Sequence, residues 1–182
     1  LGALAVKRAL EDASVTRVDA LFASNMLSDE LQNQKQVAAL IADQAGLHGI
    51  EALEVKAATA SGAAALRMAY LAVASGEANL AIAVGVEKMS EGVATPALAK
   101  ALDAEKELPS GATLISRNAD LMRLYIENHH PPENAFANFA VVAHENARTN
   151  PYALFRDKRI RARDVLNSRM VKMTGPHAGF DS

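Results

Sequence analysis

The stretch from Val55 to Leu66 constrains what this chain can fold into more than any other stretch. At its start, Leu53 and Val55 alternate with the charged Glu54 and Lys56. This alternation has the period of a β-strand with one apolar face. Small residues follow directly, and the apolar spacing then becomes that of a helix. The stretch therefore predicts a strand, a tight turn and a helix in direct succession.

The predicted helix begins at Ser61, an expected N-cap, and stops at Gly76. Thr59 falls in the turn, where its side chain is expected to point off the strand end toward the positive end of the helix dipole. That position suits a nucleophile, because a helix N-terminus lowers the pKa of a thiol placed there. We expect this helix to be buried through its apolar residues, namely Leu66, Met68, Ala69, Tyr70, Leu71 and Val73.

The rest of the first half also alternates between helix and strand. Strands are predicted at 18–26, 51–58 and 79–86, and helices at 1–14, 32–47 and 61–75. The helix at 32–47 is expected to place Val37, Leu40, Ile41 and Ala45 on its core face. The run at 79–86 is apolar throughout and predicts a central strand buried on both faces. This alternation indicates an α/β fold with a mostly parallel sheet.

The pattern changes after Met89, since no good strand is seen from Ser90 to about Asn150. Helices are expected at 97–102, 114–128 and 136–149, with Pro131 and Pro132 ending the second of them. A mostly helical segment of this kind is what an insertion following the last strand would look like.

Composition excludes several classes of function. Among the 182 residues the formal net charge is -2 and aromatic residues make up 4%, so neither a nucleic-acid footprint nor a polybasic membrane patch is expected. Cysteine is absent, which excludes disulfides, thiolate metal sites and thiol nucleophiles. The sequence shows no membrane-spanning apolar run and no signal peptide, so we expect a soluble, cytoplasmic protein.

The run from Ala57 to Met89 is similar to the thiolase superfamily, most closely to its sterol-carrier-protein-type and archaeal-type acetyl-CoA acetyltransferases. Two later runs, Phe139 to Ala147 and Asn150 to Arg156, match the same members, and the resemblance covers roughly Leu1 to Arg169. It implies a thiolase-like fold, in which helices and a mixed sheet form layers and a mostly helical loop domain is inserted.

The resemblance also implies a domain organisation. Residues 1–89 would form the N-terminal α/β core, with its opening strand missing, and residues 90–162 would form the loop domain. Residues 163–182 would be a return segment with an atypical tail, and the C-terminal half of the family would be absent. His177 lies in that tail, where Gly175-Pro176-His177 does not reproduce the family's Gly-His-Pro element.

The activity implied by the resemblance is acyl transfer between coenzyme A thioesters, by thiolysis or Claisen condensation of a 3-ketoacyl chain. Coenzyme A thioester is then a substrate, and no cofactor is expected. The family's nucleophilic cysteine corresponds to Thr59. Three interpretations stay open: an acyltransferase with altered or lost activity, a thiolase-like aldolase or lyase, and a non-catalytic subunit or acyl-CoA-binding scaffold.

Other candidate site residues each carry a structural alternative. Gly62 would offer a backbone amide to a substrate carbonyl, or allow tight helix packing. Met89 would line an acyl pocket or the core, and His144 would line that pocket or pair with Glu145 or Asn146. No metal site is expected. Cations available for coenzyme A phosphates, or simply for a solvated face, are Arg117, Arg123, Lys158, Arg159 and Arg161.

The partners expected from the resemblance are acyl-CoA and further polypeptide. Family members form homodimers or tetramers, and archaeal-type members associate with a small OB-fold acyl-CoA-binding protein. A chain that lacks the C-terminal half would also leave apolar surface for that half, or for a second polypeptide, to cover.

Overall fold

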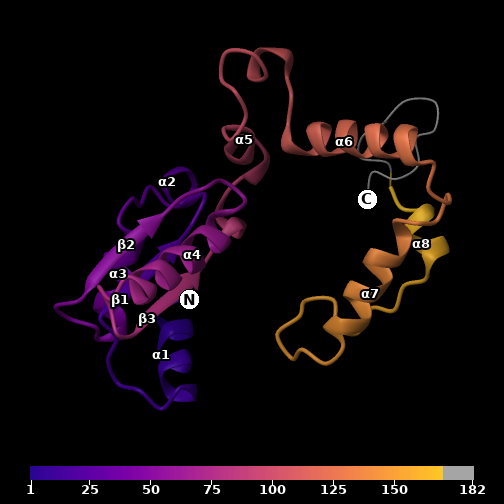
Figure 1. Ribbon diagram of the computed structural model, residues 1–182. Helices are drawn as coiled ribbons and strands as arrows, with labels where there is room; N and C mark the ends of the chain where they lie inside the picture. The colour runs from indigo at the N-terminus through magenta and orange to yellow at the C-terminus, as the bar shows by residue number, and fades with distance from the viewer. Residues whose placement is uncertain (170–182) are drawn as a thin grey trace. The chain divides into compact units, whose positions relative to one another are not determined.

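The computed structural model describes residues 1–169, and its contacts divide the chain into two units, Leu1–Ala101 and the part from Leu102 onward (Figure 1). The predictions for the tail beyond Arg169, including His177, lie outside the described residues. The first unit contains α1 (Gly2–Asp12), β1 (Ala20–Ser24), α2 (Ser28–Leu31), α3 (Val37–Ala45), β2 (Glu51–Val55), α4 (Ser61–Ala74), β3 (Ala81–Gly85), the 3-10 helix η1 (Met89–Glu91) and α5 (Ala94–Ala99). The second contains the 3-10 helix η2 (Leu108–Ser110), α6 (Leu114–His129), α7 (Ala137–Ala147) and α8 (Ala162–Leu166).

Strand β1 lies in the middle of the described sheet, whose order is β2-β1-β3 and whose pairs are both parallel. All five residues of β1 are buried, whereas in β3 only Val84 is. The prediction that 79–86 forms the central strand is therefore wrong. An apolar run indicates that a strand packs against apolar side chains. It does not show which strand lies between two others, because that depends on the hydrogen-bond pairing of the strands.

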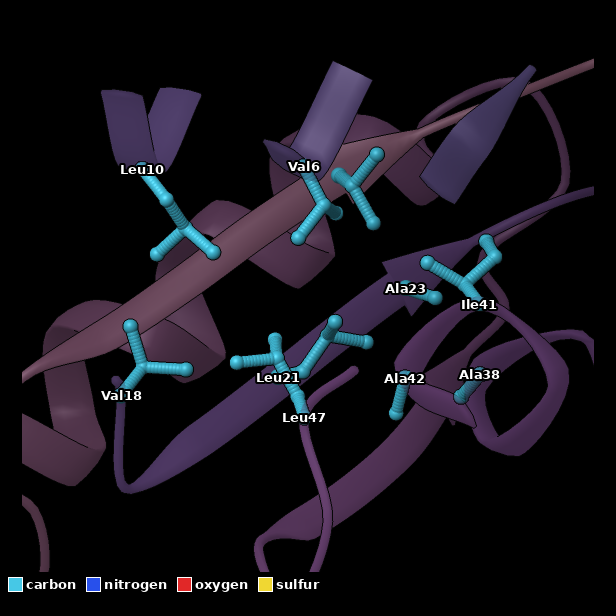
Figure 2. Close-up of a cluster of buried hydrophobic side chains, with 10 residues drawn as sticks. Val6, Leu10, Val18, Leu21, Ala23, Ala38, Ile41, Ala42 and Leu47 are labelled. Carbon is cyan, nitrogen blue, oxygen red and sulfur yellow. The ribbon is translucent and has the colours of Figure 1, made fainter. Parts of the chain in front are cut away.

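Helices cover both faces of β1. Leu21 and Ala23 face a cluster formed with α1 and α3, which includes Val6 and Ile41 (Figure 2). Ala20 and Phe22 point to the other face, into a second cluster with Ala65 and Ala69 of α4. Because successive strand residues alternate between faces, the four apolar residues of β1 serve two cores. The α/β fold predicted from the sequence is confirmed.

Helix α4 is buried only along its alanine side. Ala65 and Ala69 are 1% and 7% exposed, whereas Leu66 and Tyr70 are 65% and 69% exposed. Met68, Leu71 and Val73 are also exposed, so the prediction of a helix buried through its large apolar residues is wrong. Small side chains let the helix approach the sheet closely, and this leaves the larger ones on the far side.

The helix predicted at 32–47 is present as α3, which is shorter than predicted because it begins only at Val37 and ends at Ala45, and α2 is a separate helix that ends before the predicted range. The α3 N-terminus is fixed from another element, because the Val37 backbone N–H donates to Glu54 Oε2 at 3.1 Å. Leu40, expected on the core face, is 41% exposed, and the buried face instead uses Ala38, Ile41 and Ala42.

Residues 90–101 pack with the first unit. Helix α5 contacts α2, and Lys100 Nζ lies 2.6 Å from Glu30 Oε2. By its contacts the chain thus divides after Ala101 rather than after Met89, and the assignment of 90–162 to a loop domain stays a prediction.

In the second unit, the helices expected at 114–128 and 136–149 are present as α6 and α7. Thr113 and Ser116 cap α6 reciprocally, since each side-chain oxygen accepts the other residue's backbone N–H, at 3.1 and 3.0 Å. No helix within the described residues is long and apolar enough to cross a membrane.

Asp19 joins the start of all three strands. Its Oδ2 accepts the backbone N–H groups of Asn79 and Leu80 at 2.7 and 3.1 Å, and its carbonyl accepts that of Glu51 at 3.2 Å. The two hydrogen bonds from Asn79 and Leu80 lower the pKa of Asp19 below its usual value. The ionised carboxylate therefore stabilises the sheet.

We predict that Asp19→Asn lowers the free energy of unfolding at pH 7. A lowered folded-state pKa means that the stabilisation is complete above the unfolded pKa of about 3.9 and is lost as the pH falls through the folded value. The difference from the parent should therefore shrink below about pH 4 in denaturant titrations followed by circular dichroism. The exposed Glu77→Gln is the control, and an unchanged difference at low pH would contradict the role of the charge.

Candidate active site

A cleft of about 420 Å³ opens at the carboxyl ends of the strands. Ser24 and Gly85 contribute the ends of β1 and β3, and Ala58 and Thr59 contribute the turn that follows β2. In open parallel sheets this edge is where ligands bind. The cleft wall is mostly apolar, with Met89 and Leu98 among the residues that line it.

The turn between β2 and α4 is held by Ser61. Its hydroxyl accepts the Ala57 backbone N–H at 2.9 Å and donates to the Ala58 carbonyl at 2.6 Å. Ala58 has a φ of +48°, a conformation that is costly for a residue with a Cβ. Ser61 is itself the first helical residue and Ala60 is the N-cap, so the predicted capping role of Ser61 is wrong. The serine stabilises a strained turn instead.

Thr59 is exposed and lines the cleft at the N-terminus of α4. Within the part of the chain that the structure describes, no group hydrogen bonds to its hydroxyl. A helix N-terminus favours negative charge there, but a hydroxyl needs an adjacent base to become a nucleophile.

Three charged groups near the turn pair with one another. Lys56 pairs with Asp29 and with Glu54, the latter at 3.2 Å. Burial works to lower the pKa of Lys56, but the hydrogen bonds to Asp29 and Glu54 outweigh it and raise the pKa. The hydrogen bond from Lys56 in turn lowers the pKa of Asp29. Lys56 therefore stays protonated at neutral pH and cannot act as a base.

Sequence reasoning missed Asn25 and Glu87, which line the cleft beside Thr59. The Asn25 side-chain amide donates to the Val86 carbonyl at 2.5 Å and to Glu87 Oε2 at 3.3 Å. Glu87 Oε1 accepts the Met26 backbone N–H. These contacts tie the ends of β1 and β3 together. Their positions just after two parallel strands were the signal that could have found them.

Gly62 and Met89 line the same cleft as Thr59, so the structure brings these three predicted site residues together. A Cβ built on Gly62 would lie 3.9 Å from Ser24 Oγ, which is ordinary contact. Tight helix packing therefore does not require this glycine. A binding role for Gly62 or Met89 stays a prediction.

His144 belongs to the second unit, on α7. Its Nδ1 lies 3.3 Å from the Lys158 carbonyl, and its ring stacks on Phe155 at a centroid distance of 6.0 Å. His144 is thus a helix-surface histidine whose partner is the Lys158 carbonyl, and not the Glu145 or Asn146 considered from the sequence. The partner lies in a loop 14 residues further along the chain. Sequence reasoning that considers only adjacent residues does not detect such a contact.

The cations considered for coenzyme A phosphates fall into two groups. Arg117 pairs with Glu107 and Asp120, and Arg123 pairs with Glu127 at 3.0 Å. Lys158, Arg159 and Arg161 instead line a separate polar cavity of about 460 Å³ beside α7. No group of His, Asp or Glu that could hold a metal ion occurs among residues 1–169.

The model of the thiolase N-terminal domain matches residues 1–162. The chain belongs to the thiolase family. It is 42% identical over 166 residues to an acetyl-CoA acetyltransferase of Methanothermobacter thermautotrophicus, covering 90% of the chain and 43% of the relative. It is 39% identical over 155 residues to an acetyl-CoA acetyltransferase of Methanocaldococcus jannaschii, covering 85% of the chain and 39% of that relative. The chain thus spans less than half the length of these thiolases.

We predict that Ser61→Ala destabilises the chain by about 1–3 kcal/mol, because the Ala57 N–H and the Ala58 carbonyl lose their partner in the turn. Denaturant unfolding followed by circular dichroism measures the change. Ser75→Ala is the matched control, since that exposed hydroxyl only donates to the Ala72 carbonyl at 3.2 Å and should cost less than about 0.5 kcal/mol. Equal effects of the two substitutions would contradict the role of Ser61.

Proposed function

We propose that this chain is the N-terminal part of a thiolase-family protein that binds coenzyme A thioesters, and that acyl transfer through Thr59 is lost or strongly slowed. Membership of the thiolase family and the names of the two relatives support acyl-CoA chemistry. The observation that carries the proposal is Thr59 itself, exposed in the cleft at the carboxyl edge of the sheet.

The missing step is formation of the acyl-enzyme. A cysteine thiolate would attack the thioester carbonyl carbon, form a new carbon–sulfur bond and release coenzyme A as its thiolate, which then takes a proton. A free thiol has a pKa near 8.5, and a helix N-terminus lowers it further. The Thr59 hydroxyl is far less acidic, and no base contacts it among the described residues, so the helix dipole alone does not activate it.

The cleft supports thioester binding without covalent chemistry. Its volume of about 420 Å³ and its largely apolar wall suit a short acyl chain with part of the pantetheine arm. In this proposal the Gly62 amide meets the thioester carbonyl and Met89 contacts the acyl chain. A role for His144 in binding acyl-CoA stays a prediction, which concerns the second unit alone.

We also propose that further polypeptide of the C-terminal thiolase type covers α4. Leu66, Tyr70 and Val73 recur at helical spacing and are 65%, 69% and 45% exposed, which makes a continuous apolar stripe. The relatives are more than twice as long as the matched region, which supports the presence of such a polypeptide. Homodimers or tetramers, and association with a small OB-fold acyl-CoA-binding protein, are extensions of the same proposal.

Two other functions remain as outcomes of the test. A lyase or aldolase would turn over a thioester substrate without an adduct, since it keeps the cleft and does not need the cysteine. A scaffold subunit would bind acyl-CoA and do neither. Both the lyase and the scaffold would bind their ligand in the same cleft, and neither needs an activated nucleophile there.

We predict that Thr59→Cys restores an acyl adduct that the parent lacks. The protein, together with a C-terminal thiolase polypeptide, would be incubated with acetyl-CoA and examined by intact mass and by loss of thioester absorbance. One acetyl group should appear on the Thr59→Cys protein and none on the parent or on Thr59→Ala. An adduct mapping to Thr59 in the parent would overturn the proposal and establish a threonine-based acyltransferase. Cleavage of a 3-hydroxyacyl-CoA into acetyl-CoA and a carbonyl compound, without an adduct, in both the parent and Thr59→Ala would instead establish a lyase.

We predict that Tyr70→Glu leaves the stability of the isolated chain within about 0.5 kcal/mol but weakens its association with a C-terminal thiolase polypeptide. The reason is that Tyr70 is 69% exposed in the isolated chain and lies on the apolar stripe. Sedimentation velocity, with and without the part of the Methanothermobacter relative that this chain does not match, measures the association. Arg67→Glu, on another side of α4, is the control. Unchanged association of Tyr70→Glu, or self-association only, would contradict the proposed occupant.

A further inference from the structure

Ser24 lies at the bottom of the cleft in the first unit. It is the last residue of β1, the middle strand of the described sheet, and it is 3% exposed. Thr59, Gly62 and Gly85 line the same cleft, but all three are exposed. A buried residue of the middle strand beside exposed neighbours marks the deep end of a cleft. Ser24 therefore forms part of the cleft floor, and the other three residues form part of its rim.

The side chain of Ser24 lies on the α4 face of β1. Side chains two positions apart along a strand share a face, so Ser24 follows Ala20 and Phe22, which pack in the cluster with α4. The space at Gly62 agrees with this, since a Cβ built there would lie 3.9 Å from Ser24 Oγ. The hydroxyl thus lies beside the start of α4, at the inner end of the apolar cleft.

Two glycines leave room around this hydroxyl. Ser24 is the register partner of Gly85, and a Cβ built on Gly85 would approach Ser24 Oγ to 3.2 Å, which is closer than ordinary van der Waals contact. Gly62 flanks the same hydroxyl from α4. Because neither glycine contributes a side chain, the Ser24 side chain is the part of these three residues that limits the depth of the cleft.

The other buried polar residues that line the cleft, Asn25 and Ser61, have fixed partners. The Asn25 amide donates to the Val86 carbonyl, and the Ser61 hydroxyl holds the turn. Ser24 Oγ donates to the Val84 carbonyl at 3.5 Å, which is longer than the usual O–H···O range of about 2.5–3.0 Å. A substitution at Ser24 therefore breaks no strong hydrogen bond, so it tests the depth of the cleft rather than the stability of the fold.

We propose that Ser24 sets the length of the acyl chain that the cleft admits, which makes it a specificity-determining residue. The inference rests on the proposed function, because it concerns the thioester that the cleft is proposed to bind. An acyl chain that enters past Thr59 gains about fourfold in affinity for each methylene that leaves water, until its end meets the Ser24 side chain. Beyond that length a further methylene must displace packed atoms or stay in water, so the affinity stops rising.

Isothermal titration with acyl pantetheines from acetyl to octanoyl measures this length limit. The whole chain is used together with a C-terminal thiolase polypeptide, and pantetheine thioesters are chosen because they lack the nucleotide phosphates. For the parent, the affinity should rise about fourfold per methylene up to a limiting length and then level off. Ser24→Gly removes the Cβ and the hydroxyl oxygen from the floor, so the limit should move to a chain longer by about one methylene. Ser24→Thr adds a methyl group and should move the limit to a shorter chain.

Gly62→Ala provides a second measure that leaves Ser24 unchanged. Its Cβ would fill the floor from the α4 side at an ordinary contact distance, so it should also shorten the limit. Ser28→Gly is the matched control, because Ser28 is likewise 3% exposed but does not line the cleft, and its limit should equal that of the parent.

The outcomes separate this inference from the proposed function. If the parent binds acyl pantetheines and the limiting length is the same in Ser24→Gly, Ser24→Thr and Gly62→Ala, the inference is overturned and the proposed function stands. If neither the parent nor any variant binds an acyl pantetheine, the proposed function is overturned and the inference with it. Opposite shifts of the limit in Ser24→Gly and Ser24→Thr establish Ser24 as the residue that sets chain length.

Discussion

Strand β1 pairs along its full length with both β2 and β3, and the rest of the first unit depends on that double pairing. It fixes three carboxyl ends at one edge of the sheet, and this brings together residues some sixty positions apart, such as Asn25 and Glu87. It also explains why all of β1 is buried, since each face of the strand is covered by a helical layer. At the opposite edge of the sheet, the Asp19 carboxylate accepts the backbone N–H groups of Asn79 and Leu80, which directly precede β3.

The turn at residues 57–61 contains both a strained backbone conformation and the candidate reactive residue, Thr59. Ala58 adopts a positive φ, and the buried Ser61 hydroxyl holds that conformation from inside. The result presents Thr59 to the cleft at a helix N-terminus. This arrangement would suit a thiolate. A hydroxyl in the same place is favoured by the helix dipole, but among residues 1–169 it has no adjacent base to accept its proton.

The two units each contain a cavity, and the walls of the two cavities differ in character. The first has a largely apolar cleft beside Thr59, and the second has a cation-rich cavity beside His144. Each unit can therefore be examined on its own chemistry.

The sequence by itself determined the alternation of strand and helix, the placement of Thr59 in the turn before α4, and the helical character of 114–128 and 136–149, because these follow from local spacing and caps. The tertiary structure alone decided that β1 rather than β3 is central, that the alanines of α4 and not Leu66 or Tyr70 are buried, and that His144 meets Phe155. The spacing of apolar residues identifies which side chains share a face of a helix or strand. It does not show what packs against that face. Only the pairing of segments distant along the chain decides burial, and with it which side chains gather at a site.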